Sequence, residues 1–165
     1  MSDINSLFLV ALGGNLPFGG QNVASNLVSA VLRLAEKGLR PRAISRFFAT
    51  PCFPPGAGPD YVNAAISAES TLPPAAVLAL LHEVEQEFGR ERQARWGARG
   101  LDLDLLAYDD MVGMVDGVSL PRGEITENAF VLGPLAEIAR AEMHPIAQKT
   151  YADLWRHFDM AGQEL

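Results

Sequence analysis

The stretch Leu101-Asp102-Leu103-Asp104-Leu105-Leu106 alternates acidic and apolar side chains, and it predicts a β-strand over Leu101–Tyr108. Successive side chains of a strand point to opposite faces, so Asp102 and Asp104 share one face and the leucines at 101, 103 and 105 occupy the other. The two carboxylates are then roughly 7 Å apart on a rigid element. Such a pair can hold hard divalent cations, especially where phosphate oxygens complete the ligand shell.

Four arginines stand just before this strand, at positions 90, 92, 95 and 99. Their planar, permanently charged side chains suit phosphate groups. Carboxylates, a metal and arginines together suggest phosphoryl transfer. A plainer interpretation remains open, because a half-exposed strand can show two aspartates to water beside a solvated basic loop, and a DxD motif is short.

The segments around this strand predict an α+β fold. Those before it are a strand at Leu7–Leu12, a helix capped by Asn22 and ending at Gly38, a strand within Ala43–Ala49, a strand at Tyr61–Glu69 and a helix from Pro73–Pro74 to Gly89. Those after it are a short hairpin at Met111–Leu120 around Asp116-Gly117 and helices at Phe130–Ala139 and Tyr151–Phe158. The order βαββαβ predicts a ferredoxin-like antiparallel sheet with helices on one face, followed by a C-terminal extension.

Composition bounds the class of protein. A chain of 165 residues predicts one domain over 1–165, and its net charge of −7 argues against general binding to nucleic acid. No apolar run approaches a membrane span, the first residues lack the pattern of a signal peptide, and a lone cysteine, Cys52, cannot form an internal disulfide. We therefore expect a cytoplasmic protein with no membrane partner. Lys37 and Lys149 are the only lysines, so there is no glycine-rich GxxxxGK[ST] phosphate loop.

The segment Arg95–Asp104 resembles the signature RWGPR[ST]LDLD of the 6-hydroxymethyl-7,8-dihydropterin pyrophosphokinase family. Other segments are similar to further motifs of that family, in order and at family-like spacing over about residues 7–140. They are Gly13-Gly14-Asn15 (GSN in the family), Thr50-Pro51 with Pro59–Ala64 (TP and PDYxNA), Glu85 with Gly89-Arg90 (E…GR) and Phe130–Leu135 (F[VM]L.PL).

The resemblance implies an activity and its partners. Members of the family transfer the terminal diphosphate of ATP, as one unit, to the hydroxymethyl group of a reduced pterin, in a step toward folate, and they release AMP. Two Mg²⁺ ions are the implied cofactors, bridging the triphosphate. ATP and the reduced pterin are the implied small-molecule partners, and we expect a monomer.

The resemblance also implies site residues. The implied metal ligands are Asp102 and Asp104, and the catalytic group is these two aspartates with Arg90, Arg92 and Arg99. The implied pterin site is Asn15, Thr50, Pro51, Phe53, Tyr61, Asn63 and Phe130. The implied ATP site is Glu85, Arg90, Arg92, Trp96, Arg99, Leu105, Ser119 and Arg122. No general base is assigned.

Plainer roles stay open at several of these positions. Tyr61 and Phe130 also suit ordinary core packing. Asn15 and Asn63 also suit turns or helix caps, and Glu85 also suits a solvated charge on a helix. These roles differ in burial and in hydrogen-bond partners.

The chain departs from the family pattern near the expected nucleotide. The usual histidine after Pro121 is Arg122 here, and the usual arginine before Phe130 is Asn128. Within the signature, Ala98 replaces proline and Gly100 replaces a hydroxyl residue, which should loosen that loop. These changes favour an alternative, a pterin- or nucleotide-binding paralogue with weak or no activity. A plain interaction module would need the motif matches to be accidental.

Overall fold

The computed structural model describes residues 5–51, 56, 60–89 and 100–160. The elements are β1 (Ser6–Gly14), α1 (Val23–Glu36), β2 (Arg40–Ile44), β3 (Phe48–Thr50), β4 (Tyr61–Ser70), α2 (Pro74–Glu87), β5 (Asp102–Tyr108), β6 (Gly113–Val115), β7 (Val118–Leu120), the 3₁₀-helix η2 (Gly123–Thr126), α3 (Ala129–Ile138) and α4 (Tyr151–Met160). No described helix combines the length and apolar character that crossing a membrane requires.

The main sheet is antiparallel throughout, with strand order β2-β4-β1-β5 and β3 paired to β4 beyond the end of β2. β1 therefore lies between β4, which carries Tyr61 and Asn63, and β5, which carries Asp102 and Asp104. The short β6–β7 hairpin turns at Asp116 and Gly117, whose φ angles of 49° and 82° are both positive, as a two-residue hairpin turn requires.

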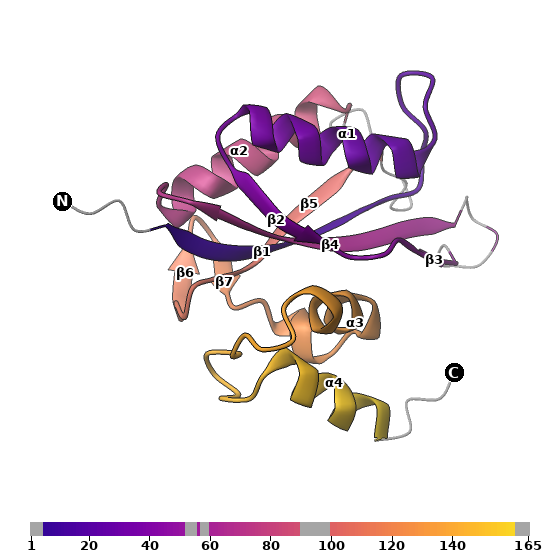
Figure 1. Ribbon diagram of the computed structural model, residues 1–165. Helices are drawn as coiled ribbons and strands as arrows, with labels where there is room; N and C mark the ends of the chain where they lie inside the picture. The colour runs from indigo at the N-terminus through magenta and orange to yellow at the C-terminus, as the bar shows by residue number, and fades with distance from the viewer. Residues whose placement is uncertain (1–4, 52–55, 57–59, 90–99, 161–165) are drawn as a thin grey trace.

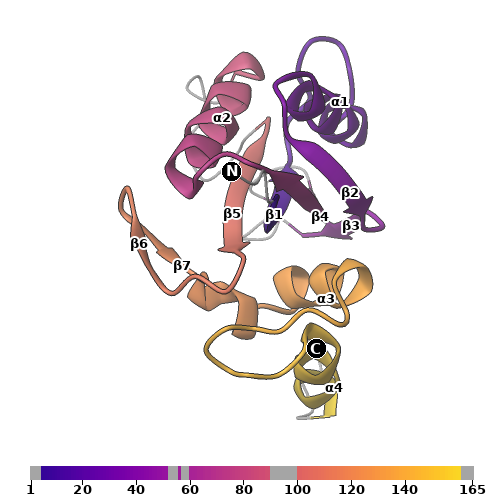
Figure 2. The ribbon, with the colours of Figure 1, turned by 60° about the vertical axis from the view of Figure 1, so that its left-hand side comes forward.

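Helices cover both faces of the sheet (Figures 1 and 2). α1 and α2 lie on one face, where Leu27, Leu34 and Leu81 pack into a core with the β1 and β5 side chains of that face. The βαββαβ fold with its two helices on one face is confirmed. The C-terminal extension, α3 and α4, forms a layer on the other face around a second core that contains Leu135 and Tyr151.

Local signals account for the helix boundaries. Asn22 Oδ1 accepts a hydrogen bond from Ser25 N at 2.8 Å, which caps α1, and Gly38 follows the helix with φ 105°. Pro74 stands in the first turn of α2, where its missing N–H costs nothing.

The second strand differs from the prediction. One strand was expected within Ala43–Ala49, but β2 begins at Arg40 and a separate β3 begins at Phe48. Ser45 explains the break, because its hydroxyl accepts a hydrogen bond from Ala65 N at 2.9 Å while its own N–H donates to Ala65 O at 2.9 Å. A side chain that takes a backbone position in the ladder ends regular pairing. The prediction of one strand was therefore wrong.

Candidate active site

The two aspartates of β5 lie on the face of the sheet that carries α3. Asp102 and Asp104 are half-buried, whereas Leu103 and Leu105 are buried in the core beneath α1 and α2. The predicted alternation of β5 is therefore confirmed, and both carboxylates point to the same side of the sheet.

Both aspartates line a hollow of about 180 Å³ together with three residues expected at the pterin. Tyr61 and Asn63 enter it from β4, and Phe130 enters it from the first turn of α3. The volume is below the roughly 300–1,000 Å³ of pockets for drug-sized ligands, so the described walls suit a small ring rather than two whole substrates. Ring-binding and metal-binding candidates from distant parts of the sequence thus meet in one place.

Gly13 joins the two halves of this hollow. In the sheet it faces Asn63 of β4 on one side and Asp102 of β5 on the other. Neighbouring strands are about 4.8 Å apart, so the backbones of Asn63 and Asp102 are about 10 Å apart across Gly13. A Cβ atom at position 13 would lie 3.1 Å from Asn63 Oδ1, which is tighter than an ordinary contact. The missing side chain keeps the space between amide and carboxylate open.

A hydrogen bond sets the orientation of the Asn63 amide. Asn63 Nδ2 donates to Thr50 Oγ1 at 3.0 Å, and Thr50 itself is buried. This bond uses one donor of the amide and leaves Oδ1 on the side of Gly13. Thr50 thereby supports the hollow without lining it.

Phe130 is placed by the cap of its own helix. Asn128 Oδ1 accepts a hydrogen bond from Phe130 N at 2.8 Å at the start of α3. The Phe130 side chain is 44% exposed and Tyr61 is half-buried, so neither aromatic ring is enclosed in a core. Exposed aromatic faces beside a polar amide are suited to stacking against a planar ligand.

Glu85 lies behind β5, on the opposite face from the hollow. Its side chain is 3% exposed, and Oε2 accepts a hydrogen bond from Leu103 N at 2.6 Å. The idea of a solvated helix charge is therefore wrong for Glu85. The carboxylate holds the strand backbone at Leu103, the residue between Asp102 and Asp104. Glu85 therefore positions the two aspartates through the backbone.

Leu105 also faces away from the hollow. Its side chain is fully buried in the core beneath α1 and α2, so any contact with a nucleotide would have to come from its backbone. The Leu105 carbonyl already accepts a hydrogen bond from Arg122 Nε at 3.3 Å.

The remaining expected residues divide into two groups. Asn15 is buried, Pro51 follows β3 and is exposed, and Ser119 is exposed on β7, and none of the three lines the hollow. The other group lies outside the described residues and consists of Phe53, Arg90, Arg92, Arg95, Trp96 and Arg99.

The described residues offer an incomplete shell for a metal. No group of three or more histidine, cysteine, aspartate or glutamate side chains in the described part of the chain is placed to hold an ion. Asp102 and Asp104 supply carboxylate oxygens, the ligands that Mg²⁺ prefers, and Glu124 lines another wall of the hollow. A cation here needs oxygen ligands from a substrate.

The sequence matches the family described as 7,8-dihydro-6-hydroxymethylpterin-pyrophosphokinase (HPPK) over residues 9–140. The chain belongs to the HPPK family. A Synechocystis relative named 2-amino-4-hydroxy-6-hydroxymethyldihydropteridine pyrophosphokinase is 36% identical over 152 residues, which cover 92% of this chain and 75% of that protein. A Haemophilus influenzae relative of the same name is 34% identical over 139 residues, which cover 84% of this chain and 85% of that protein.

Solved structures show the same HPPK fold. The chain resembles Plasmodium falciparum HPPK-DHPS in its wild-type form with a TM-score of 0.71 at 12% identity, and in its A437G form with SDX-DHP with a TM-score of 0.73 at 11% identity. The matches cover 97% and 99% of this chain but only 46% and 47% of those chains. This chain therefore spans less than half of those solved proteins, and the likeness concerns the fold.

Two of the departures from the HPPK pattern, Arg122 and Asn128, have defined partners. Arg122 Nη2 lies 3.3 Å from Asp104 Oδ1, so the arginine that replaces the usual histidine is paired with an expected metal ligand. Asn128, which replaces the usual arginine, caps α3 and so positions Phe130. Each replacement therefore touches a residue of the HPPK hollow.

Sequence reasoning missed several residues that line or shape this HPPK site. Gly13 and Val131 were noted only as parts of motifs, Asn128 only as the replacement of an arginine, and Glu124 was given no role, although Gly13, Glu124, Asn128 and Val131 all line the hollow. For Gly13 a signal existed, because a glycine at the end of an apolar strand marks a place where a ligand or backbone approaches closely. Nothing in the sequence near Glu124 or Val131 indicates which way they point.

Proposed function

We propose that this chain transfers the diphosphate of ATP to the hydroxymethyl group of 6-hydroxymethyl-7,8-dihydropterin and releases AMP. The observation that carries the proposal is the single hollow in which Tyr61, Asn63 and Phe130 meet Asp102 and Asp104. Membership of the HPPK family supports the same reaction.

The ring end of the hollow suits a pterin. Tyr61 and Phe130 offer aromatic faces for a bicyclic ring, and Asn63 offers a carbonyl oxygen to its N–H groups. Asn63 supplies specificity because its amide is already fixed by Thr50 and needs no reorganisation on binding. Along the row through Gly13, the hydroxymethyl group would then lie toward Asp102.

The other end of the hollow suits Mg²⁺ bound to a triphosphate. Asp102 and Asp104 fit as ligands of the two implied ions, since they are half-buried carboxylates on one face of a rigid strand. When bound, the ions would neutralise phosphate charge and polarise the attacking and departing oxygens. The role of the protein side chains is to hold the triphosphate in line with the pterin hydroxyl.

The arginines complete this proposal. We assign phosphate binding to Arg90, Arg92 and Arg99, and a supporting contact with the nucleotide to Trp96, on the resemblance alone. Arg122 is the one arginine of the set whose position is described, and it pairs with Asp104. We propose that its guanidinium exchanges Asp104 for a phosphate oxygen when a cation occupies the carboxylates.

We further infer that the chain acts as a single domain and a monomer. Its use of ATP fits a cytoplasmic location.

The test is AMP release from ATP and Mg²⁺, measured with and without 6-hydroxymethyl-7,8-dihydropterin. Pterin-dependent AMP supports the proposal, and Asp102→Asn and Asp104→Asn should each lower the rate at least about a hundredfold while the fold persists. Asp110→Asn, an exposed aspartate beyond the end of β5, is the matched control and should keep its activity. Pterin binding without AMP release would instead support the alternative, a binding paralogue, which the Arg122–Asp104 pair favours.

A further inference from the structure

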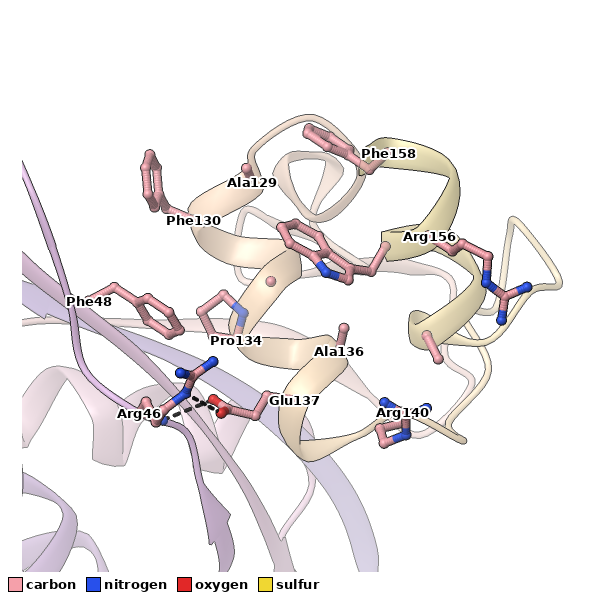
Figure 3. Close-up of a pocket in the computed structure, with 13 residues that line it drawn as sticks. Arg46, Phe48, Ala129, Phe130, Pro134, Ala136, Glu137, Arg140, Arg156 and Phe158 are labelled. Carbon is pink, nitrogen blue, oxygen red and sulfur yellow. Dashed lines mark hydrogen bonds and ion pairs between the residues drawn. The ribbon is translucent and has the colours of Figure 1, made fainter. Parts of the chain in front are cut away.

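A second and larger hollow, of about 710 Å³, lies along α3 between the β2–β3 segment and α4. It shares Phe130 with the hollow described above but contains neither aspartate of β5. Figure 3 shows Arg46 and Phe48 on one side of α3, and Phe158 and Arg156 on α4 at the other side. The proposed reaction uses no part of this groove except Phe130.

Small residues of α3 make room for the aromatic side chains of the groove. A Cβ atom at Gly133 would come within 3.2 Å of the Trp155 ring, so the missing side chain lets the indole lie against the helix backbone. Trp155 is 36% exposed and stacks on Phe158 with ring centroids 6.1 Å apart. One wall of the groove is therefore a half-exposed, ordered aromatic surface.

The opposite wall is held in place by an ion pair. Glu137 of α3 accepts hydrogen bonds from both the backbone N and the Nε of Arg46, at 3.0 and 2.6 Å. These bonds hold the pKa of Glu137 below its ordinary value, so the pair stays charged. The Arg46 guanidinium also lies 5.4 Å from the centre of the Phe48 ring, which fixes that aromatic face.

The charge at the rim selects the kind of ligand. Three arginines line the groove, and two of them have acidic partners, Arg46 with Glu137 and Arg156 with Asp153 at 3.3 Å. Arg140 is exposed and has no ion pair within the described residues. An uncompensated guanidinium beside aromatic walls, in a chain of net charge −7, favours a ligand that is both flat and anionic.

We propose that this groove binds a flat aromatic ring that carries one carboxylate. The ring packs along α3 against Trp155 and Phe48, and the carboxylate pairs with Arg140. The binding does not depend on catalysis, so it can be tested separately from the proposed pyrophosphokinase reaction.

The probe is 2-naphthoate, titrated into the full-length protein by calorimetry, with the neutral 2-naphthalenemethanol as the chemical control. The neutral compound should bind roughly tenfold more weakly, since it lacks the charge-assisted hydrogen bond. Arg140→Glu should weaken naphthoate binding by about the same factor or more and leave binding of the neutral compound unchanged. Arg40→Glu, an exposed arginine on β2 outside the groove, is the matched control and should bind naphthoate normally.

Two further measurements locate the ligand. Trp155→Leu should weaken both probes, because it removes an aromatic wall common to both. A saturating concentration of 6-hydroxymethylpterin should leave naphthoate bound, since the pterin occupies the other hollow. Equal affinity for the two probes, full naphthoate binding by Arg140→Glu, displacement by the pterin, or no binding at millimolar naphthoate would each overturn the proposal.

Discussion

At the scale of single residues, Gly13 lies between the expected ring site and the expected metal site and keeps the space between them open. Its position between Asn63 and Asp102 means that any side chain would project into the row that joins them. Gly13→Val should raise the dissociation constant for the pterin at least about tenfold, because valine suits a strand but fills the hollow. Calorimetry with the pterin alone measures this, and Gly13→Ala should give a smaller loss. Unchanged pterin affinity in the valine variant would place the ring elsewhere.

Arg122 makes a second prediction at this scale. It pairs with Asp104, so its charge competes with a cation for that carboxylate. Arg122→Ala should therefore bind Mn²⁺ several times more tightly than the unchanged protein in the absence of ATP. An electron paramagnetic resonance titration of free Mn²⁺ measures the affinity. Arg122→Lys keeps the charge and serves as the control. If the alanine variant binds Mn²⁺ no more tightly than the lysine variant, Arg122 does not compete with the cation.

At the scale of elements, β5 depends on support from α2. The Leu103 N–H on this strand edge is bonded to the buried Glu85 carboxylate. Glu85→Leu leaves that N–H unpaired, and we expect a loss of about 1–3 kcal/mol in the free energy of unfolding together with weaker Mn²⁺ binding at Asp102 and Asp104. Glu85→Gln keeps an acceptor oxygen and should restore most of both. Urea unfolding and the Mn²⁺ titration give the two values, and Gln behaving like Leu would show that charge, rather than the hydrogen bond, matters.

The turn before α4 should respond to pH. His144 is buried, its Nδ1 accepts hydrogen bonds from the backbone N–H groups of Ile146 and Ala147, and burial lowers its pKa below the ordinary value. The unfolded chain therefore binds a proton more readily than the folded one. The stability from neutral His144 is complete above about pH 6.5 and is lost as the pH falls through the lowered folded pKa.

The corresponding experiment compares asparagine substitutions at two histidines. His144→Asn keeps an acceptor but cannot titrate, so its free energy of unfolding should fall less than that of the unchanged protein between about pH 7.5 and about pH 5. His82→Asn changes an exposed position on α2, and its free energy of unfolding should fall over this pH range as much as that of the unchanged protein. Equal pH dependence for all three proteins would exclude His144 as the cause.

At the scale of the whole molecule, both edges of the sheet are protected from pairing with another chain. The β2 edge carries Pro41 between two exposed arginines. On the β5 edge, Leu103 N already donates a hydrogen bond to the Glu85 carboxylate, and Leu106 O already accepts one from Arg122 N. Proline and charge on an edge strand oppose strand addition. We predict a monomer of 17.8 kDa by light scattering coupled to size-exclusion chromatography, and a mass near twice that value would contradict it.

The sequence by itself determined the features that depend on a few neighbouring residues. The alternation around Asp102 and Asp104 sets which face of β5 is polar, because the strand period is local. The Asn22 cap and the Asp116-Gly117 turn follow from side-chain and φ preferences in the same way. The interruption at Ser45 escaped prediction, because the hydroxyl acts on Ala65, twenty residues away.

Only the tertiary structure decided which distant residues meet. Sequence order does not state that β1 lies between β4 and β5, and this placement alone sets Gly13 between Asn63 and Asp102. The direction of Glu85 toward Leu103, and the layer of α3 and α4 that creates the second groove, likewise come from packing across the whole chain. Periodicity reports which face of an element is apolar, whereas the partner of that face is chosen by burial summed over all elements.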